Sequence, residues 1–143
     1  MIRLATILDI KAIRSLLEQA GYRVEKGMLQ QQVNMMLGYP HQQLLVYEVD
    51  NQIVAFAAIH FIIQMAYDGE LVFISSLVVA EQYRNRGIGT ELEEYILMLA
   101  RERKCDRIQV HSQDWQNSLH RFYGKHGYTE YPKYFSKRLM YAE

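Results

Sequence analysis

The segment at residues 78–100, "VVAEQYRNRGIGTELEEYILMLA", passes from an apolar run through a loop of arginines and glycines into a long amphipathic run. Apolar residues at positions 92, 95, 96 and 99 recur at helical spacing, so we expect a helix from about residue 87 to 104. The apolar run before the loop is typical of a strand with both faces buried. The segment therefore predicts a strand, a tight loop and a helix in succession.

The loop has the properties of an anion site. The first N–H groups of a helix have no intrahelical partner, and the helix dipole favours phosphate there. Gly87 and Gly89 would let a ligand approach the backbone, while Arg84 and Arg86 would add positive charge. Equally, the glycines could shape a tight turn beside solvated arginines, because short glycine motifs often match by chance. Neither a P-loop ending nor a full Gly-x-Gly-x-x-Gly is present, since position 92 is Leu.

Composition limits the kinds of protein this chain can be. The length of 143 residues is typical of one domain, residues 1–143. The net charge of zero is not typical of a nucleic-acid binder. A single cysteine excludes an internal disulfide, and the histidines show no pair with zinc spacing, so we expect no metal. Without a signal-peptide layout or about 18 continuous apolar residues, we expect a cytoplasmic protein that does not enter a membrane.

Strands and helices alternate along the chain. We expect a first strand at residues 2–5, a helix over 10–20 that Thr6 or Asp9 caps, and a second helix over 27–37. Residues 43–79 indicate three antiparallel strands with turns at 50–51 and 68–69. A strand at 107–112, a helix at 118–126 and a last strand at 133–141 follow. This order predicts an α+β (mixed α/β) fold, a mostly antiparallel sheet with helices on both faces.

Two motifs together resemble the GNAT N-acetyltransferases. Residues 84–89, "RNRGIG", resemble the acetyl-CoA signature of that family, Arg/Gln-x-x-Gly-x-Gly/Ala. Residues 117–128, "NSLHRFYGKHGY", resemble its second motif, an Asn followed by Phe-Tyr and then Gly-Phe/Tyr. The closing segment is also similar to small-molecule members, such as aminoalkylphosphonate N-acetyltransferases. The resemblance covers essentially the whole chain and implies a GNAT-like fold.

The resemblance also implies which residues bind acetyl-CoA. The backbone of the strand end would pair with the pantetheine arm, and the amides of the loop would hold the pyrophosphate. These residues are Leu77, Val78 and Val79 on the strand, and Arg84, Asn85, Arg86, Gly87, Ile88, Gly89 and Thr90 in the loop. Asn117 matches the coenzyme-contacting Asn of the family, although it could instead cap a helix. One departure is Glu81, where many members have proline.

Acetyl transfer from a thioester to an amine needs a base for the amine, stabilisation of the carbonyl oxygen and an acid for the leaving thiolate. Tyr123 occupies the Phe-Tyr position of the second motif, where the family places a phenol near the coenzyme sulfur. We therefore expect Tyr123 to be both the general acid and a coenzyme contact. The alternative is that Tyr123 only packs against other side chains, because the sequence has 11 tyrosines and most of them must be packing or surface residues.

The base is harder to assign. Many family members carry Glu or Asp at positions that correspond to residues 73–76, but this sequence has Phe-Ile-Ser-Ser there. Glu70 is the nearest acid on the strand, and alternation points it to the opposite face unless a bulge intervenes. His111 follows as a second candidate, and a water relay through Ser75 or Ser76 as a third. We expect His60, in an apolar strand, to be a hydrogen-bonded core histidine.

The resemblance thus implies an acetyl-CoA-dependent N-acetyltransferase that acetylates a primary amine of a small molecule by direct transfer in a ternary complex. Two alternatives remain: acetylation of a protein or peptide amine, and a non-catalytic acyl-CoA-binding regulatory module that lacks a base. The apolar last strand is compatible with a homodimer edge, as the family often dimerises.

Overall fold

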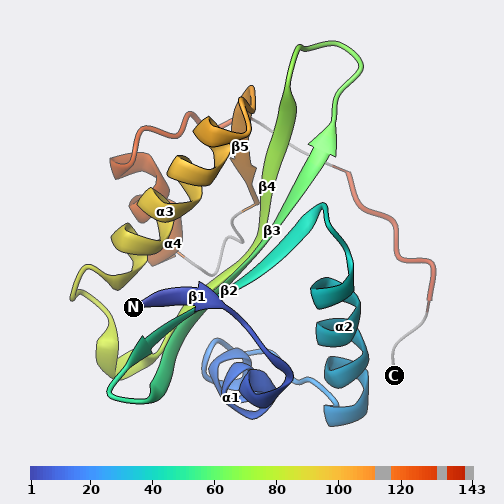
Figure 1. The fold of residues 1–143 in the computed structure, drawn as a ribbon. Coiled ribbons are helices and arrows are strands. Elements are labelled where there is room, and N and C mark those ends of the chain that lie inside the picture. The colour runs from blue at the N-terminus through green and yellow to red at the C-terminus, as the bar shows by residue number, and fades with distance from the viewer. Residues whose placement is uncertain (112–116, 132–134, 141–143) are drawn as a thin grey trace. The chain divides into compact units, whose positions relative to one another are not determined.

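The fold is built on a five-stranded sheet whose strands lie in the order β1-β2-β3-β4-β5 (Figure 1). The computed structural model describes residues 1–111, 117–131 and 135–140, with residues 117–119 described by backbone alone. It divides into two units, Met1–His111 and Ser112–Glu143, and the sheet belongs to the first. The strands are β1 (Ile2–Leu4), β2 (Gln42–Val49), β3 (Gln52–Ile63), β4 (Glu70–Val79) and β5 (Arg107–Val110).

Most of the sheet is antiparallel. The first three strand pairs are antiparallel, and β5 joins β4 in parallel after the helix that separates them in sequence. Asp50 and Asn51 both have positive φ, 48° and 64°, which is the geometry of the two-residue hairpin turn predicted at this point. The mostly antiparallel α+β fold predicted from the sequence is confirmed.

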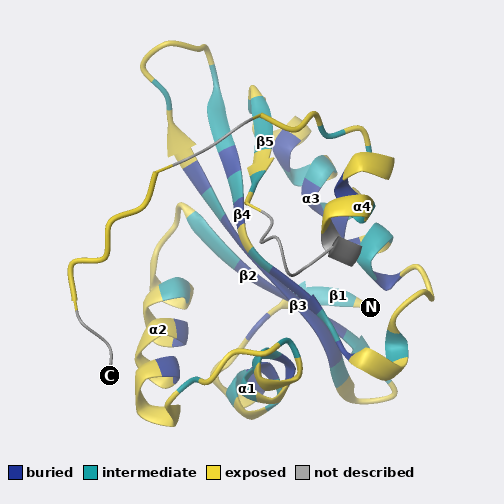
Figure 2. Cartoon of the chain, turned by 180° about the vertical axis from the view of Figure 1, so that it is seen from behind, coloured by how far each residue is buried: buried dark blue, intermediate teal, exposed yellow. Residues whose placement is uncertain are grey.

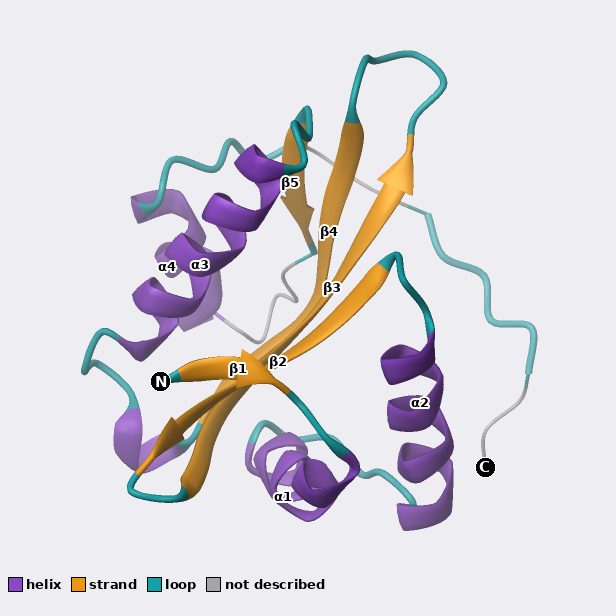
Figure 3. Cartoon of the chain, viewed as in Figure 1, coloured by secondary structure: helices purple, strands orange, loops and turns teal. Residues whose placement is uncertain are grey.

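Three helices complete the first unit: α1 (Ile10–Gln19), α2 (Lys26–Gly38) and α3 (Ile88–Glu102). Figure 1 shows α1 and α2 on one side of the sheet and α3 on the other, and Figure 3 gives the same elements by type. The six residues 54–59 of β3 are all buried (Figure 2). Because successive strand residues point to opposite faces, this run means that helices cover both faces.

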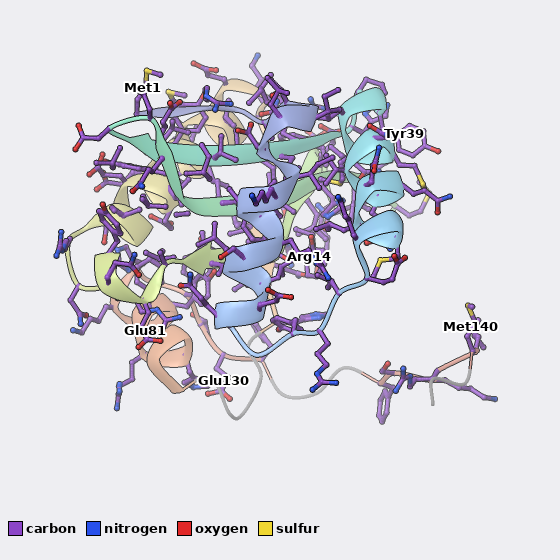
Figure 4. All side chains as sticks on the ribbon, turned by 90° about the horizontal axis from the view of Figure 1, so that it is seen from below. Met1, Arg14, Tyr39, Glu81, Glu130 and Met140 are labelled. Carbon is purple, nitrogen blue, oxygen red and sulfur yellow. The ribbon has the colours of Figure 1, made fainter. Side chains whose placement is uncertain are left out.

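Of the two residues proposed as caps, Thr6 caps the short helix that leads into α1, whereas Asp9, at the N-cap of α1 itself, makes no side-chain capping hydrogen bond to α1. The Thr6 hydroxyl accepts from the Leu8 N–H in the short helix η1 (Ile7–Asp9), and the Asp9 carboxylate accepts from the Thr6 N–H. Asp9 also accepts two hydrogen bonds from the Arg3 guanidinium, at 2.8 and 3.0 Å, which ties the cap to β1. The N-terminal ammonium group of Met1, labelled in Figure 4, donates to the carbonyl of Glu48 on β2.

The second unit contains α4 (Asn117–Lys125). Gly127, with φ of 85°, follows the helix as the sequence predicted. The predicted last strand at 133–141 is wrong for its described residues, because residues 135–140 form no strand. Their apolar side chains are exposed, Phe135 to 96% and Leu139 to 85%, so these residues lack the packing that stabilises a strand.

Candidate functional site

The candidate site begins at the point along β4 where the strand is no longer paired with β5. The ladder between β4 and β5 runs from Leu71 to Ile74 and stops there. On the other side, β4 stays paired with β3 as far as Val79. Within the described chain, the end of β4 therefore presents one edge of backbone groups without a strand partner. Leu77, Val78 and Val79, the predicted coenzyme-pairing residues, lie on this stretch.

A bulge marks the same point of β4. Ser76 pairs with Ala58 and Ile74 pairs with Ile59, so Ser75 is an extra residue opposite β3. A bulge bends its strand and re-aims the side chains around it. The bulge lies next to the last pair of the β4–β5 ladder, Ile74 with Val110, where β5 ends.

The predicted phosphate loop follows directly. After β4 the chain makes a short helix η2 (Glu81–Tyr83), whose first N–H donates to the side chain of Gln19 on α1 (Glu81 is labelled in Figure 4). The side chain of Arg84 then contacts the end of β4, where its Nε donates to the Val79 carbonyl at 3.1 Å. The Arg86 guanidinium lies 5.1 Å from the centre of the Tyr83 ring. Both arginines are exposed, so positive charge stands beside the start of α3.

Gly87 sets the entry into α3. It is the N-cap of the helix and has φ of 84°, in the left-handed region that disfavours side chains. A methyl group built on Gly87 would have no protein atom within 4 Å. The backbone conformation thus favours glycine, while the space in front of it is open. Ile88, which follows, is buried and anchors the helix start, and Gly89 and Thr90 are half-buried in the first turn.

Four side chains gather around the bulge. Nε2 of His60 on β3 lies 2.7 Å from the Ser75 hydroxyl oxygen. His60 pairs across the strands with Phe73, their ring centres 6.1 Å apart. His111, just after β5, packs edge-on against Phe73 at 5.0 Å. Burial lowers the pKa of His60 below its ordinary value. The sequence placed His60 in the core, and only the pairing of β3 with β4 brings it to Ser75.

Glu70 lies elsewhere. It pairs with Ile63 at the other end of β4, and its carboxylate forms an ion pair with Arg103 at 3.0 Å. The Arg103 guanidinium also stacks on Phe61, 3.8 Å from the ring centre. Glu70 lies five positions before Ser75, which is about 17 Å at the rise of a strand. The bulge comes after Phe73, so alternation keeps Glu70 on the face opposite His60. This arrangement speaks against Glu70 as the base.

The second motif belongs to the other unit. Tyr123, the predicted acid, is 5% exposed on α4 and packs edge-on against Phe122 and Tyr128, each with ring centres 5.2 Å apart. Asn117 is the first residue of α4, and its side chain lies outside the described part of the chain. The roles of both residues stay predictions.

Two features are absent from the described residues, a cluster of metal ligands and a helix able to span a membrane. No group of three histidine, cysteine, aspartate or glutamate side chains is arranged there to hold a metal ion. No helix among the same residues has the length and apolar character needed to span a bilayer.

Comparison with known proteins agrees with this fold. The sequence model of the acetyltransferase (GNAT) family matches residues 10–128, which is most of the chain. The chain therefore belongs to the GNAT acetyltransferase family. The class of enzyme predicted from the sequence, an N-acetyltransferase, is confirmed at the level of this family.

Individual relatives are more distant. The chain is 26% identical over 95 residues to the thialysine N-epsilon-acetyltransferase of Mus musculus; that stretch is 64% of this chain and 56% of the mouse protein. The fold of this chain resembles that of a transcriptional regulator from Bacillus halodurans C-125, with a TM-score of 0.89 and 21% identity. The match covers 97% of this chain and 99% of the other. The fold also resembles that of a GNAT family acetyltransferase from Staphylococcus aureus, with a TM-score of 0.80, 18% identity and 97% and 98% covered.

Proposed function

We propose that this chain transfers an acetyl group from acetyl-CoA to a primary amine of a small molecule, directly and within a ternary complex. One observation carries the proposal: the glycine-arginine loop at the start of α3 is continuous with the one-sided end of β4. Coenzyme A joins a pyrophosphate to an amide-containing arm. A helix start with adjacent arginines fits the pyrophosphate, and an open strand edge fits the amides.

The proposed roles follow from the chemistry. The loop at residues 84–90 holds the pyrophosphate through its backbone, and Leu77, Val78 and Val79 pair with the pantetheine arm. This arrangement leads the arm from the loop back along β4 towards the bulge. Tyr123 supplies a proton to the leaving thiolate, and Asn117 contacts the coenzyme. A base must remove a proton from the acceptor, since an alkylamine with a pKa of about 10.4 is protonated near neutrality.

A small-molecule acceptor has support from the mouse relative, whose name describes acetylation of the side-chain amine of an amino acid. Residues 73–76 offer no carboxylate to attract a cationic amine, so recognition of the acceptor must use other residues. Peptide amines and simple coenzyme binding are therefore built into the test as alternative outcomes.

The test measures thiol release from acetyl-CoA with a panel of small amines and short peptides. Wild type is compared with Tyr123→Phe and with Tyr131→Phe, a matched change at a tyrosine that is 83% exposed. We expect turnover with a small amine that Tyr123→Phe nearly abolishes and Tyr131→Phe preserves, while coenzyme binding by calorimetry persists in all three. Turnover only with peptides would replace the small-molecule acceptor. Tight coenzyme binding without turnover on any acceptor would overturn the proposed acetyltransferase activity and favour a non-catalytic binding module.

A further inference from the structure

The contact between His60 and Ser75 joins a titratable group to the bulge of β4. The two side chains come from neighbouring strands and meet at 2.7 Å, a short distance for a nitrogen–oxygen hydrogen bond. The Ser75 hydroxyl also lies 3.4 Å from the Ala58 carbonyl, a much weaker contact. The short contact fits a Ser75 hydroxyl that donates to Nε2 of His60, which requires the imidazole tautomer that carries its hydrogen on Nδ1.

The position of this pair matches the path of the acyl group in the proposed complex. The coenzyme arm would run from the loop along Val79, Val78 and Leu77, so its thioester end would reach Ser75 and Ser76. The distance from Val79 to Ser75 along the strand is about 13 Å. Ser75 is exposed at this point, and its partner His60 is half-buried.

We propose that His60 is the general base of acetyl transfer and that it acts through the hydroxyl of Ser75. This inference rests on the proposed function. The protonated acceptor gives a proton to the Ser75 oxygen, and Ser75 gives its own proton to Nε2 of His60. A serine without a base cannot do this at neutral pH, while a neutral imidazole can.

The remaining steps balance as follows. The freed nitrogen lone pair forms a bond to the acetyl carbon, the carbon–sulfur bond breaks, and the thiolate takes a proton from the acid, Tyr123 in the proposed complex. The second proton of the amine nitrogen restores Tyr123 by way of solvent. His60 releases its proton to solvent, so the net products are the amide, the free thiol and one proton.

The surroundings of His60 suit this role. Burial lowers its pKa, so the imidazole is neutral and able to accept a proton at pH 7. Its neighbours on adjacent strands are Gln42 on β2 and Phe73 on β4, and neither carries charge. His111, on the other side of Phe73, is the nearest titratable group in this chain of contacts. Glu70 lies on the opposite face and is paired with Arg103.

The experiment compares wild type with His60→Gln, Ser75→Ala, the double variant, and His41→Gln as a control at an exposed histidine. Removing a general base typically costs about 10²–10⁴-fold in rate. We expect His60→Gln to lose kcat in this range, Ser75→Ala to lose less because water can replace the hydroxyl, and the double variant to be no slower than His60→Gln. His41→Gln should match wild type. Calorimetry should show acetyl-CoA binding unchanged throughout.

The pH profile separates a base from a structural histidine. In wild type, kcat should fall at acid pH as His60 becomes protonated, and this fall should be absent from His60→Gln. A His60→Gln variant that binds coenzyme, melts as wild type and keeps most of its kcat would overturn the inference. So would a double variant whose loss is the product of the single losses. If wild type itself turns over no amine, the proposed function fails first, which is a different result.

Discussion

Replacing Gly87 by alanine tests the start of α3 as both a structural and a coenzyme-binding position. The added methyl group meets no protein atom within 4 Å, so crowding contributes nothing. The cost comes from φ of 84°, a conformation that costs a non-glycine residue about 1–2 kcal/mol. Reduced freedom of the unfolded chain offsets about 0.4–1 kcal/mol of this. We expect a net loss near the lower end, about 1 kcal/mol, or about 3 °C in Tm.

The coenzyme should be affected more than the fold. In the proposed complex the pyrophosphate occupies the open space in front of Gly87, and a methyl group there both fills that space and strains the loop that must hold the ligand. We expect acetyl-CoA affinity to fall by about tenfold or more, which corresponds to 1.4 kcal/mol. Denaturant unfolding measures the stability, and titration calorimetry measures the affinity.

Gly38→Ala is the matched control. Gly38 ends α2, lacks a positive φ, and also has no atom within 4 Å of an added methyl group. Alanine there should raise stability by up to about 1 kcal/mol and leave coenzyme affinity unchanged. If Gly87→Ala were as stable as wild type, the argument from backbone conformation would be refuted. If it were less stable but bound acetyl-CoA normally, the pyrophosphate would lie elsewhere.

Three further predictions concern stability and the base. The Arg3 guanidinium lowers the pKa of Asp9, so this pair should stabilise the fold above about pH 3.9, the unfolded value, and lose that contribution as pH falls through the lower folded pKa. Acid unfolding of Asp9→Asn should then show a weaker dependence on pH than wild type. Glu70→Gln should cost under about 1 kcal/mol by removing the partly exposed pair with Arg103, and should reduce kcat far less than the roughly 10²-fold expected for loss of a base. Leu92→Ala, at a fully buried position of α3, should cost about 2–5 kcal/mol in denaturant unfolding.

Local patterns allowed much of the fold to be predicted. The apolar stripe of α3 recurs every three or four residues, and its members Leu92 and Ile96 are indeed fully buried. The turn at Asp50 and Asn51 was predictable because these residue types tolerate positive φ. In each case the deciding interaction lies within a few residues of the chain.

Features that depend on two distant strands could not be read in this way. The bulge at Ser75 exists only relative to the register of β3, and neither strand reveals that register by itself. The contact of His60 with Ser75 depends on the same register, so His60 was placed in the core. The prediction of the last strand was wrong for a related reason, since residues 135–140 include large apolar side chains but have no packing that would stabilise a strand. The only signal in the sequence for the proposed base was a histidine in an apolar strand.

The end of the β4–β5 ladder at Ile74 has a consequence for the handling of the protein. Among the described residues, the edge of β4 beyond Ile74 has no strand partner; such an edge is a template on which another polypeptide can pair, and natural proteins usually protect it. In the proposed complex the coenzyme arm takes that place, so the ligand protects the edge as well as supplying the acetyl group. Protein stripped of coenzyme should therefore self-associate faster on storage or mild heating than protein saturated with it, and the availability of coenzyme would help to keep the chain soluble.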